Sequence, residues 1–175
     1  MSLALNFLIE GQTGQEWHFS AGQTVFHLGS PVHQVHFVRR GIIHLLRHQS
    51  DGTALVLQRA VPGAMLAEAS IYSDIYHCDA CAQEAAVTFA VERDDLRRHL
   101  DSSPQARQAL VQIYAQGLQQ ARMQCEILSL KTVKARLSAW LVWNGELPPK
   151  GQWRRIAGEI GVSPEALYRE IAARG

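Results

Sequence analysis

The chain has 175 residues, of which 47% are hydrophobic, enough for one substantial core and a smaller second one. Seventeen Lys and Arg residues oppose sixteen Asp and Glu residues, so the formal net charge of +1 by itself indicates nothing about nucleic acid. No apolar run reaches the roughly eighteen residues of a membrane-spanning helix, and the N-terminus lacks the basic start of a signal peptide. We therefore expect a cytoplasmic protein with no membrane partner.

Residues 17–91 alternate short apolar runs with Gly, Pro and Asp, a pattern typical of closely spaced β-strands. Their regular spacing predicts a small antiparallel barrel or a jelly roll. The pair Arg40-Gly41 and the segment Ser50-Asp-Gly-Thr53 mark two hairpin turns. The predicted strands are 23–28, 35–39, 42–47, 54–59, 80–84 and 87–91.

After the last predicted strand the apolar period becomes helical, first over residues 94–100. Ser103-Pro104 then begins a stretch that we predict to be helical almost throughout to Asn144, followed by a linker over 145–151. The long helix carries an apolar stripe at three-four spacing, typical of a two-stranded coiled-coil seam; the alternative is packing against the same chain. The stripe consists of Val111, Tyr114, Leu118, Ala121, Cys125 and Leu128.

The last residues predict two short amphipathic helices joined by a tight turn, which is a helix-turn-helix. Ile156 and Ile160 share one face of the first helix. Gly161 is suited to end that helix, and Ser163 followed by Pro164 supplies an N-cap and a first-turn proline for the second. The alternative is an ordinary helical hairpin at the end of a domain.

In the second helix Leu167 and Ile171 pack inward, which leaves the opposite face for base edges and phosphates. The chain from Lys131 onward has eight basic and four acidic residues, a net +4, against −3 for the remainder. This split favours a DNA partner. One such head contacts few bases, so we also expect a homodimer. The predicted DNA-binding residues are Ser163, Glu165, Tyr168 and Arg169, with Arg154 and Arg155 in the first helix.

The arrangement resembles the Crp/Fnr family of bacterial transcription regulators across nearly the whole chain. The matching residues are Val38-Arg-Arg-Gly41, Asp51-Gly52, Val61-Pro-Gly63, Glu68, Tyr72, Arg136-Leu137 and Ile156-Ala-Gly-Glu-Ile-Gly-Val-Ser163. The resemblance implies an α+β fold: an antiparallel, jelly-roll-like β-roll, then a long dimerisation helix and a small helix-turn-helix domain. The expected domains are a β-roll sensor at 1–102, a dimerisation and connecting helix at 103–145, and a DNA-binding domain at 146–175. RNA polymerase is implied as a further partner.

Two departures from the family concern DNA. The family's base-contacting positions match Glu165 and Arg169, but Pro164 stands where another arginine is common. The sequence stops at Gly175, where family members generally continue into a β-hairpin wing, so we expect no backbone contacts from a wing. Pro164 predicts an operator that differs from the usual half-site, and the missing wing predicts a lower affinity. Together they leave open a second function: a sensor module with weakened or no DNA binding.

The effector segment also departs from the family. Members that bind cyclic AMP hold its phosphate with a segment that opens Gly-Glu and closes Arg-Ser. Here Ala67-Glu68 opens the segment and Cys78-Asp79 closes it. A buried Asp79 would repel a phosphate, so we expect no cyclic nucleotide. The candidate effector-pocket residues are Glu68, Tyr72, His77, Cys78, Asp79 and Cys81.

Soft metal ligands gather in the same segment, with His33, His36 and His44 on the neighbouring hairpin. A set of Cys and His could bind Cu(I), Zn(II) or haem iron, or a thiol could sense oxidants. Haem-dependent sensors in the family take iron ligands from this region, whereas the clustered N-terminal cysteines of its iron-sulfur members are missing. The metal-ligand candidates are His77, Cys78, Cys81 and Cys125.

The alternative is that Cys78 and Cys81 are small buried apolar residues and His77 a surface or hydrogen-bonded histidine, because free cysteine is often buried. If residues 77–82 are extended, His77, Asp79 and Cys81 share one face while Cys78 points to the other. On a coiled-coil seam Cys125 would face its own copy, as a crosslink, a two-thiolate site or a small apolar residue. No nucleophile, base and orienting group converge and no phosphate-binding loop is present, so we expect no catalysis.

Overall fold

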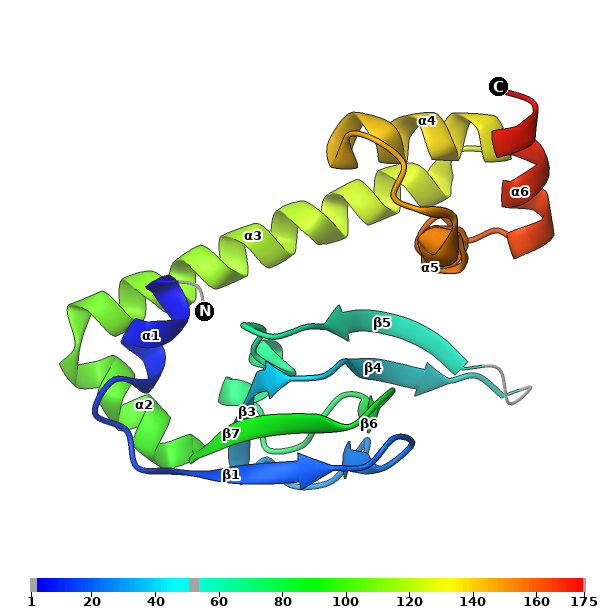
Figure 1. The fold of residues 1–175 in the computed structure, drawn as a ribbon. Helices are drawn as coiled ribbons and strands as arrows, with labels where there is room; N and C mark the ends of the chain where they lie inside the picture. The colour runs from blue at the N-terminus through cyan, green and yellow to red at the C-terminus, as the bar shows by residue number, and fades with distance from the viewer. Residues whose placement is uncertain (1–2, 51–53, 175) are drawn as a thin grey trace. The chain divides into compact units, whose positions relative to one another are not determined.

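The computed structural model describes residues 3–50 and 54–174, which form two compact units that divide after Tyr114. The first unit is a β-roll of two antiparallel sheets, with the strand orders β1-β7-β3 and β2-β6-β4-β5 (Figure 1). The predicted fold class is confirmed. The elements of this unit are α1 (Leu3–Ile9), β1 (Gly14–Phe19), β2 (Thr24–Phe26), β3 (Gln34–Arg40), β4 (Ile43–His48), β5 (Ala54–Ala60), η1 (Glu68–Tyr72), β6 (Asp79–Ala82), β7 (Ala86–Glu92), α2 (Arg93–Ser102) and the start of α3 (Pro104–Ser129).

The predicted turn at Gly41 joins β3 to β4. Gly41 has φ +82°, and a Cβ atom there would lie 2.5 Å from the Ala85 carbonyl oxygen. Only glycine fits such a turn without displacing backbone. Residues 51–53 of the second predicted turn, including Asp51-Gly52, lie outside the described residues.

In the sheet β1-β7-β3, the strands β3 and β7 are buried on both faces. On β3, Val38 belongs to the core inside the roll, whereas Val35 and Phe37 point to a second core under the helices. Because consecutive side chains of a strand point to opposite faces, a continuous apolar run such as this one serves two cores at once. The helices contribute Leu5, Leu8, Leu96, Leu100, Ala106, Ala109 and Leu110 to the second core.

Helix α1 and strand β1 of the first unit were not predicted. Helix α1 has seven residues, too few to persist alone in water, and it depends on the burial of Leu5 and Leu8. His99 adds a hydrogen bond from its ring to the Phe7 carbonyl oxygen at 2.9 Å. Strand β1 is exposed at every residue except Phe19, so its sequence carries little apolar periodicity.

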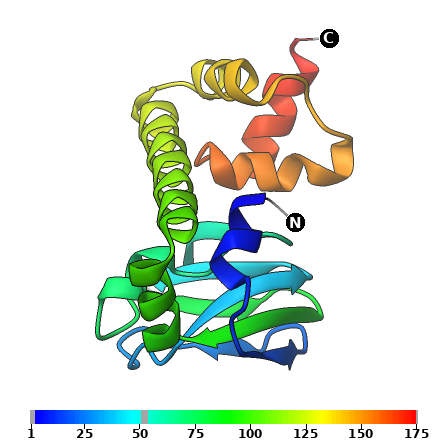
Figure 2. The same ribbon diagram turned by 90° about the vertical axis from the view of Figure 1, so that its left-hand side faces the viewer.

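The second unit holds the rest of α3 and three further α-helices around one core (Figures 1 and 2). They are α4 (Val133–Asn144), α5 (Trp153–Glu159) and α6 (Pro164–Ala172), with the short η2 (Lys150–Gln152) before α5. The helical stretch that we expected to reach Asn144 is interrupted at 130–132, where the Thr132 hydroxyl accepts a hydrogen bond from the Ala135 amide at 3.1 Å. The core consists of Ile127, Leu137, Trp140, Ile156, Ala157, Ile160 and Leu167.

Candidate nucleic-acid interface and sensor site

The segment that leads into β6 alternates strictly between the interior and the exterior of the roll. Tyr76 and Cys78 are buried, as are Ala80 and Ala82 of β6, whereas His77 is exposed. Asp79 and Cys81 are partly exposed on the outer face. This is the alternation that an extended chain predicts. The expectation of a buried Asp79 inside the pocket is wrong, because that position of the strand points outward.

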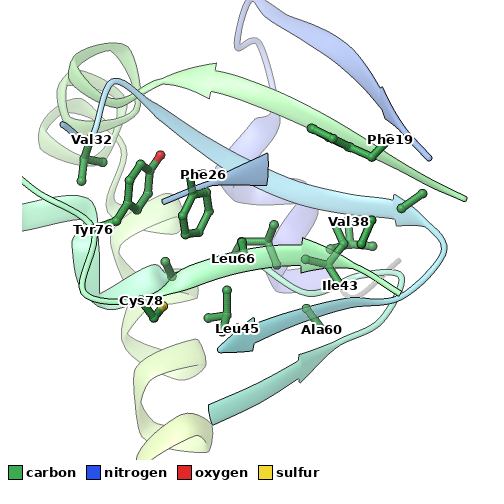
Figure 3. Packing of buried hydrophobic residues seen from close by; sticks show 14 residues of the cluster. Phe19, Phe26, Val32, Val38, Ile43, Leu45, Ala60, Leu66, Tyr76 and Cys78 are labelled. Atoms are coloured by element: carbon green, nitrogen blue, oxygen red, sulfur yellow. The ribbon is translucent and has the colours of Figure 1, made fainter. Parts of the chain in front are cut away.

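Aromatic and sulfur side chains fill the interior where the effector was expected. The rings of Phe26 and Tyr76 stack with their centroids 3.8 Å apart and their planes 6° apart, and Cys78 lies in the same core (Figure 3). The Tyr76 hydroxyl donates to the Gln34 carbonyl oxygen at 2.6 Å. Burial raises the pKa of Tyr76 to about 12 and also raises the pKa of the Cys78 thiol. Cys78 is therefore placed as a protonated core residue and not as a reactive thiolate.

His36 is a buried ionisable group in the same interior. Only 6% of it is exposed, and its ring lies against Phe19 and Phe26. Its Nδ1 atom is 3.0 Å from the Thr88 hydroxyl oxygen. Desolvation lowers the pKa of His36 to about 4, so the ring is neutral at neutral pH.

The segment that would open a nucleotide pocket keeps an unusual backbone. Ala67, which replaces the family's glycine, has φ +49°, a left-handed conformation that costs a non-glycine residue roughly 1–2 kcal/mol. Glu68 follows at the start of η1, and its carbonyl oxygen accepts a hydrogen bond from the Tyr114 hydroxyl at 3.0 Å. Tyr72 is exposed, with the Arg97 guanidinium 5.2 Å from the centre of its ring.

Two histidines flank Asp79 on the outer face. Its carboxylate oxygens lie 3.4 Å from His27 Nδ1 and 3.3 Å from His48 Nδ1, and one of them accepts the Leu28 amide at 3.0 Å. This hydrogen bond from the Leu28 amide is the main cause that lowers the pKa of Asp79. His77 instead contacts the Ser73 hydroxyl at 3.0 Å.

The predicted metal ligands do not share one surface. Cys81 pairs with His44 across β6 and β4, and its thiol donates to the Gly22 carbonyl oxygen at 3.4 Å. Cys78 points into the core instead. Over residues 3–50 and 54–174, no three His, Cys, Asp or Glu side chains are grouped closely enough to hold a metal ion.

The helix-turn-helix has the local geometry that its sequence predicts. Gly161 ends the first helix with φ +63°, and the Val162 amide donates to the Ala157 carbonyl oxygen at 2.9 Å. The Ser163 hydroxyl caps α6 by accepting the Ala166 amide at 3.2 Å. The inward positions Ile156, Ala157, Ile160 and Leu167 are all buried.

The outer face of the head presents fewer groups than expected. Glu165 and Arg169 are exposed on α6, and Arg154 is exposed on α5. A hydrogen bond from its own backbone amide, helped by the Ser163 hydroxyl, lowers the pKa of Glu165. The positive charges of Arg154 and Arg169 also act on Glu165 and lower its pKa.

Two other predicted DNA contacts are engaged within the head. The Tyr168 ring is partly buried against Trp153, with a centroid separation of 5.6 Å. Arg155 is bound to Glu159 at 2.7 Å, and the other carboxylate oxygen of Glu159 accepts the Trp140 indole NH at 2.8 Å. Glu159 is not among the predicted site residues, although its spacing of four residues from Arg155 is a signal for an ion pair.

The apolar stripe on α3 is largely uncovered. Val111 is 58% exposed and Leu118 52% exposed, Ala121 and Cys125 are also exposed, and Tyr114 is partly buried by its contact with η1. The residues occupy alternate a and d positions of a heptad.

Leu128, the last residue of the stripe, has a second environment inside the head. It is 42% exposed, and a Cβ atom on Gly161 would lie 2.7 Å from its Cδ2 atom. The turn between α5 and α6 therefore packs closely against the end of α3.

No helix in the described part of the chain combines the length and the apolar character needed to cross a bilayer.

A family model described as "Cyclic nucleotide-binding domain" matches residues 16–103. The fold is similar to that of FixK2 from Bradyrhizobium japonicum (TM-score 0.74, 19% identity, covering 92% of this chain and 84% of that one). It is also similar to CLP, described as a c-di-GMP responsive global regulator, from Xanthomonas campestris (TM-score 0.67, 19% identity, 96% and 88%). The sensor domain of the transcriptional regulator DNR from Pseudomonas aeruginosa matches over a shorter stretch (TM-score 0.54, 21% identity, 67% and 83%). No curated protein sequence matches the chain.

The burial of His36 predicts that the stability of the first unit is sensitive to acid. The unfolded chain takes up a proton at this histidine near pH 6.5, whereas the folded chain resists protonation until about pH 4. Between these values protons bind preferentially to the unfolded chain, so the free energy of unfolding falls as the pH falls, by about 3 kcal/mol in total. Urea unfolding of the wild type and of His36→Gln, at pH 7 and at pH 4.5, measures this fall.

We expect His36→Gln to lose most of the extra pH dependence. His18→Gln, which removes an exposed histidine, is the matched control and keeps it. Equal pH dependence in the wild type and in His36→Gln would contradict the assignment.

Proposed function

The chain belongs to the family of the cyclic nucleotide-binding domain, and on that premise we propose that it is a homodimeric, DNA-binding transcription regulator. The family model and the fold confirm the resemblance to Crp/Fnr regulators that was noted in the sequence. In this proposal the β-roll is the sensor half, α3 the dimer contact and α6 the helix that enters the major groove. RNA polymerase is the further partner that a regulator of this type would contact.

The observation that carries the proposal is the division of α6 into two faces. Leu167 packs into the core of the head, while Glu165 and Arg169 are exposed on the other side. An arginine guanidinium can donate two hydrogen bonds to a guanine edge, and a carboxylate can accept one from cytosine. The Ser163 cap begins the helix just before these residues, so they lie in the part of a recognition helix that approaches the bases.

Dimerisation through α3 is supported by the exposure of its apolar stripe. Leu118 in this heptad stripe is more than half exposed. Contact of such an apolar stripe with water is unfavourable unless another surface covers it. A second copy of the same helix fits it, because a two-fold axis sets each a and d residue against its own counterpart. The dimer also provides two reading heads for the two half-sites of a palindromic operator.

We further propose that the effector is not a cyclic nucleotide. The stacked rings of Phe26 and Tyr76, with Cys78 beside them, occupy the interior of the roll. The family's phosphate-binding Gly-Glu and Arg-Ser pairs are replaced by Ala67-Glu68 and Cys78-Asp79. Admitting a nucleotide would require these packed side chains to leave a core in which cavities and displacements are costly.

The alternative of a metal or haem sensor that uses His77, Cys78 and Cys81 has less support. Cys78 points to the opposite side of the strand from the other two residues, and it would have to leave the core to share an ion with them.

Selection of bound sequences from a random DNA pool tests DNA reading. We expect a palindrome whose half-sites are about ten base pairs apart, centre to centre. Replacing Arg169 by Ala should weaken binding to the selected site about 10- to 100-fold, measured by gel shift, because a paired arginine–guanine contact is lost. Arg98→Ala on α2 makes the same charge change in the roll and should leave affinity within about twofold. A pool without any enriched sequence would refute the DNA-binding function.

Sedimentation equilibrium tests the dimer. Leu118→Glu places like charges face to face in the proposed seam and should reduce the measured mass to that of one chain, 19.5 kDa. Leu28→Glu is a matched control, because Leu28 has the same 52% exposure as Leu118 but lies outside α3. A Leu118→Glu variant that remains dimeric would exclude α3 as the dimer contact.

Calorimetric titration with cyclic AMP and with cyclic GMP tests the sensor half. We expect no binding heat from either nucleotide up to about millimolar concentration, which corresponds to a binding free energy weaker than about −4 kcal/mol. Micromolar binding of either one would overturn this part of the proposal.

A further inference from the structure

One arginine joins the end of α3 to the turn of the helix-turn-helix. Arg136, in the first turns of α4, donates from Nε to the Leu130 carbonyl oxygen at 2.7 Å and from Nη2 to that of Leu128 at 3.0 Å. Its Nη1 atom donates to the carbonyl oxygens of Ile160 at 3.0 Å and of Gly161 at 2.9 Å. A single guanidinium thus binds four carbonyl oxygens.

All four carbonyl groups lie at places where a helix stops. The last carbonyl groups of a helix have no partner within the helix, so an outside donor must satisfy them or water must. Leu128 and Leu130 lie at the end of α3, and Ile160 and Gly161 lie just after α5. A guanidinium, with five N–H groups in a rigid planar fork, can serve both helix ends at once. A lysine ammonium at the same place has only three donors on one nitrogen atom, so it cannot bind all four carbonyl oxygens.

Two further contacts connect the same elements. The Gln124 side-chain amide on α3 donates to the carbonyl oxygen of Glu159 at the end of α5. Leu128 of α3 packs on Gly161, where a Cβ atom would lie only 2.7 Å away. The turn of the helix-turn-helix is therefore held on the last two turns of α3 by polar bonds and by close packing.

We propose that Arg136 is a positioning residue for DNA recognition: it fixes the reading head on the end of the dimerisation helix. This inference rests on the proposed function above. Arg136 acts through the backbone of the turn and not by contact with DNA. In a dimer joined through α3, a head held rigidly on α3 has a defined distance to the head of its partner.

A defined distance has a measurable consequence. A dimer with rigid heads should prefer one spacing of half-sites strongly, because the second head reaches its half-site only at that spacing. A dimer with loosened heads should bind a single half-site as before, gain less from the second one, and tolerate an altered spacing.

The experiment compares the wild type with Arg136→Lys on three DNA duplexes. These are the operator selected from random DNA, the same operator with one base pair inserted between the half-sites, and a single half-site. Arg107→Lys is the matched control, because the Arg107 guanidinium also binds two carbonyl oxygens near a helix end, those of Leu100 and Asp101, both at 2.7 Å, but in the roll unit. Sedimentation equilibrium and thermal unfolding of each variant accompany the binding curves.

We expect Arg136→Lys to remain a dimer, to bind the single half-site within about threefold of the wild type, and to bind the operator about tenfold more weakly. Its preference for the correct spacing over the inserted one should fall by about the same factor. Arg107→Lys should keep the wild-type preference.

If Arg136→Lys fails to fold, Gln124→Ala removes one bond of the same joint and should reduce the spacing preference by about threefold. A folded variant that keeps the wild-type spacing preference overturns the positioning role while DNA binding stands. Failure to select any operator would refute the proposed function itself, so the two outcomes are distinguishable.

Discussion

The burial of strands β3 and β7 on both faces is the constraint on which the rest of the first unit depends. One face of β3 supplies Val38 to the interior of the roll, and the other supplies Val35 and Phe37 to the core beneath α1, α2 and the start of α3. The two cores share these strands, because consecutive strand residues point to opposite sides. The helices that lead into the proposed dimer contact are therefore anchored to the same strands that line the interior of the roll.

Packed apolar side chains fill the interior of the roll, which is the proposed sensor half. Phe26 and Tyr76 stack in the core, and His36 is held there in its neutral form by desolvation. The polar residues of the same segment lie on the outer face. One of them, Asp79, is flanked there by His27 and His48. The ordinary two-residue period of an extended chain thus separates side chains that are neighbours in sequence into an apolar interior and a polar exterior.

In the first unit, buried strands hold the elements together. In the second unit, hydrogen bonds to backbone carbonyl groups have this role. The core around Trp140 and Leu167 packs the helices together, but apolar packing alone does not orient a turn. Arg136 of α4 supplies directional bonds to the end of α3 and to that turn, and the Glu159 carboxylate joins α5 to α4 by accepting the Trp140 indole NH. Two of the residues expected to contact DNA, Arg155 and Tyr168, instead contact other side chains of the head.

Most of the architecture could be predicted from the sequence, because it follows from local patterns: the alternation that separates Cys78 from Asp79, and the glycine and serine that bound the helix-turn-helix. Helix α1 could not, since its seven residues are helical only when Leu5 and Leu8 find the second core. The proposed positioning role of Arg136 could not be predicted either, because its four acceptors lie between 6 and 25 residues away along the chain. The sequence by itself determined most of the helices and strands and which side of each is apolar. Only the tertiary structure decided which polar groups are free to act, because that depends on partners that folding brings together from distant segments.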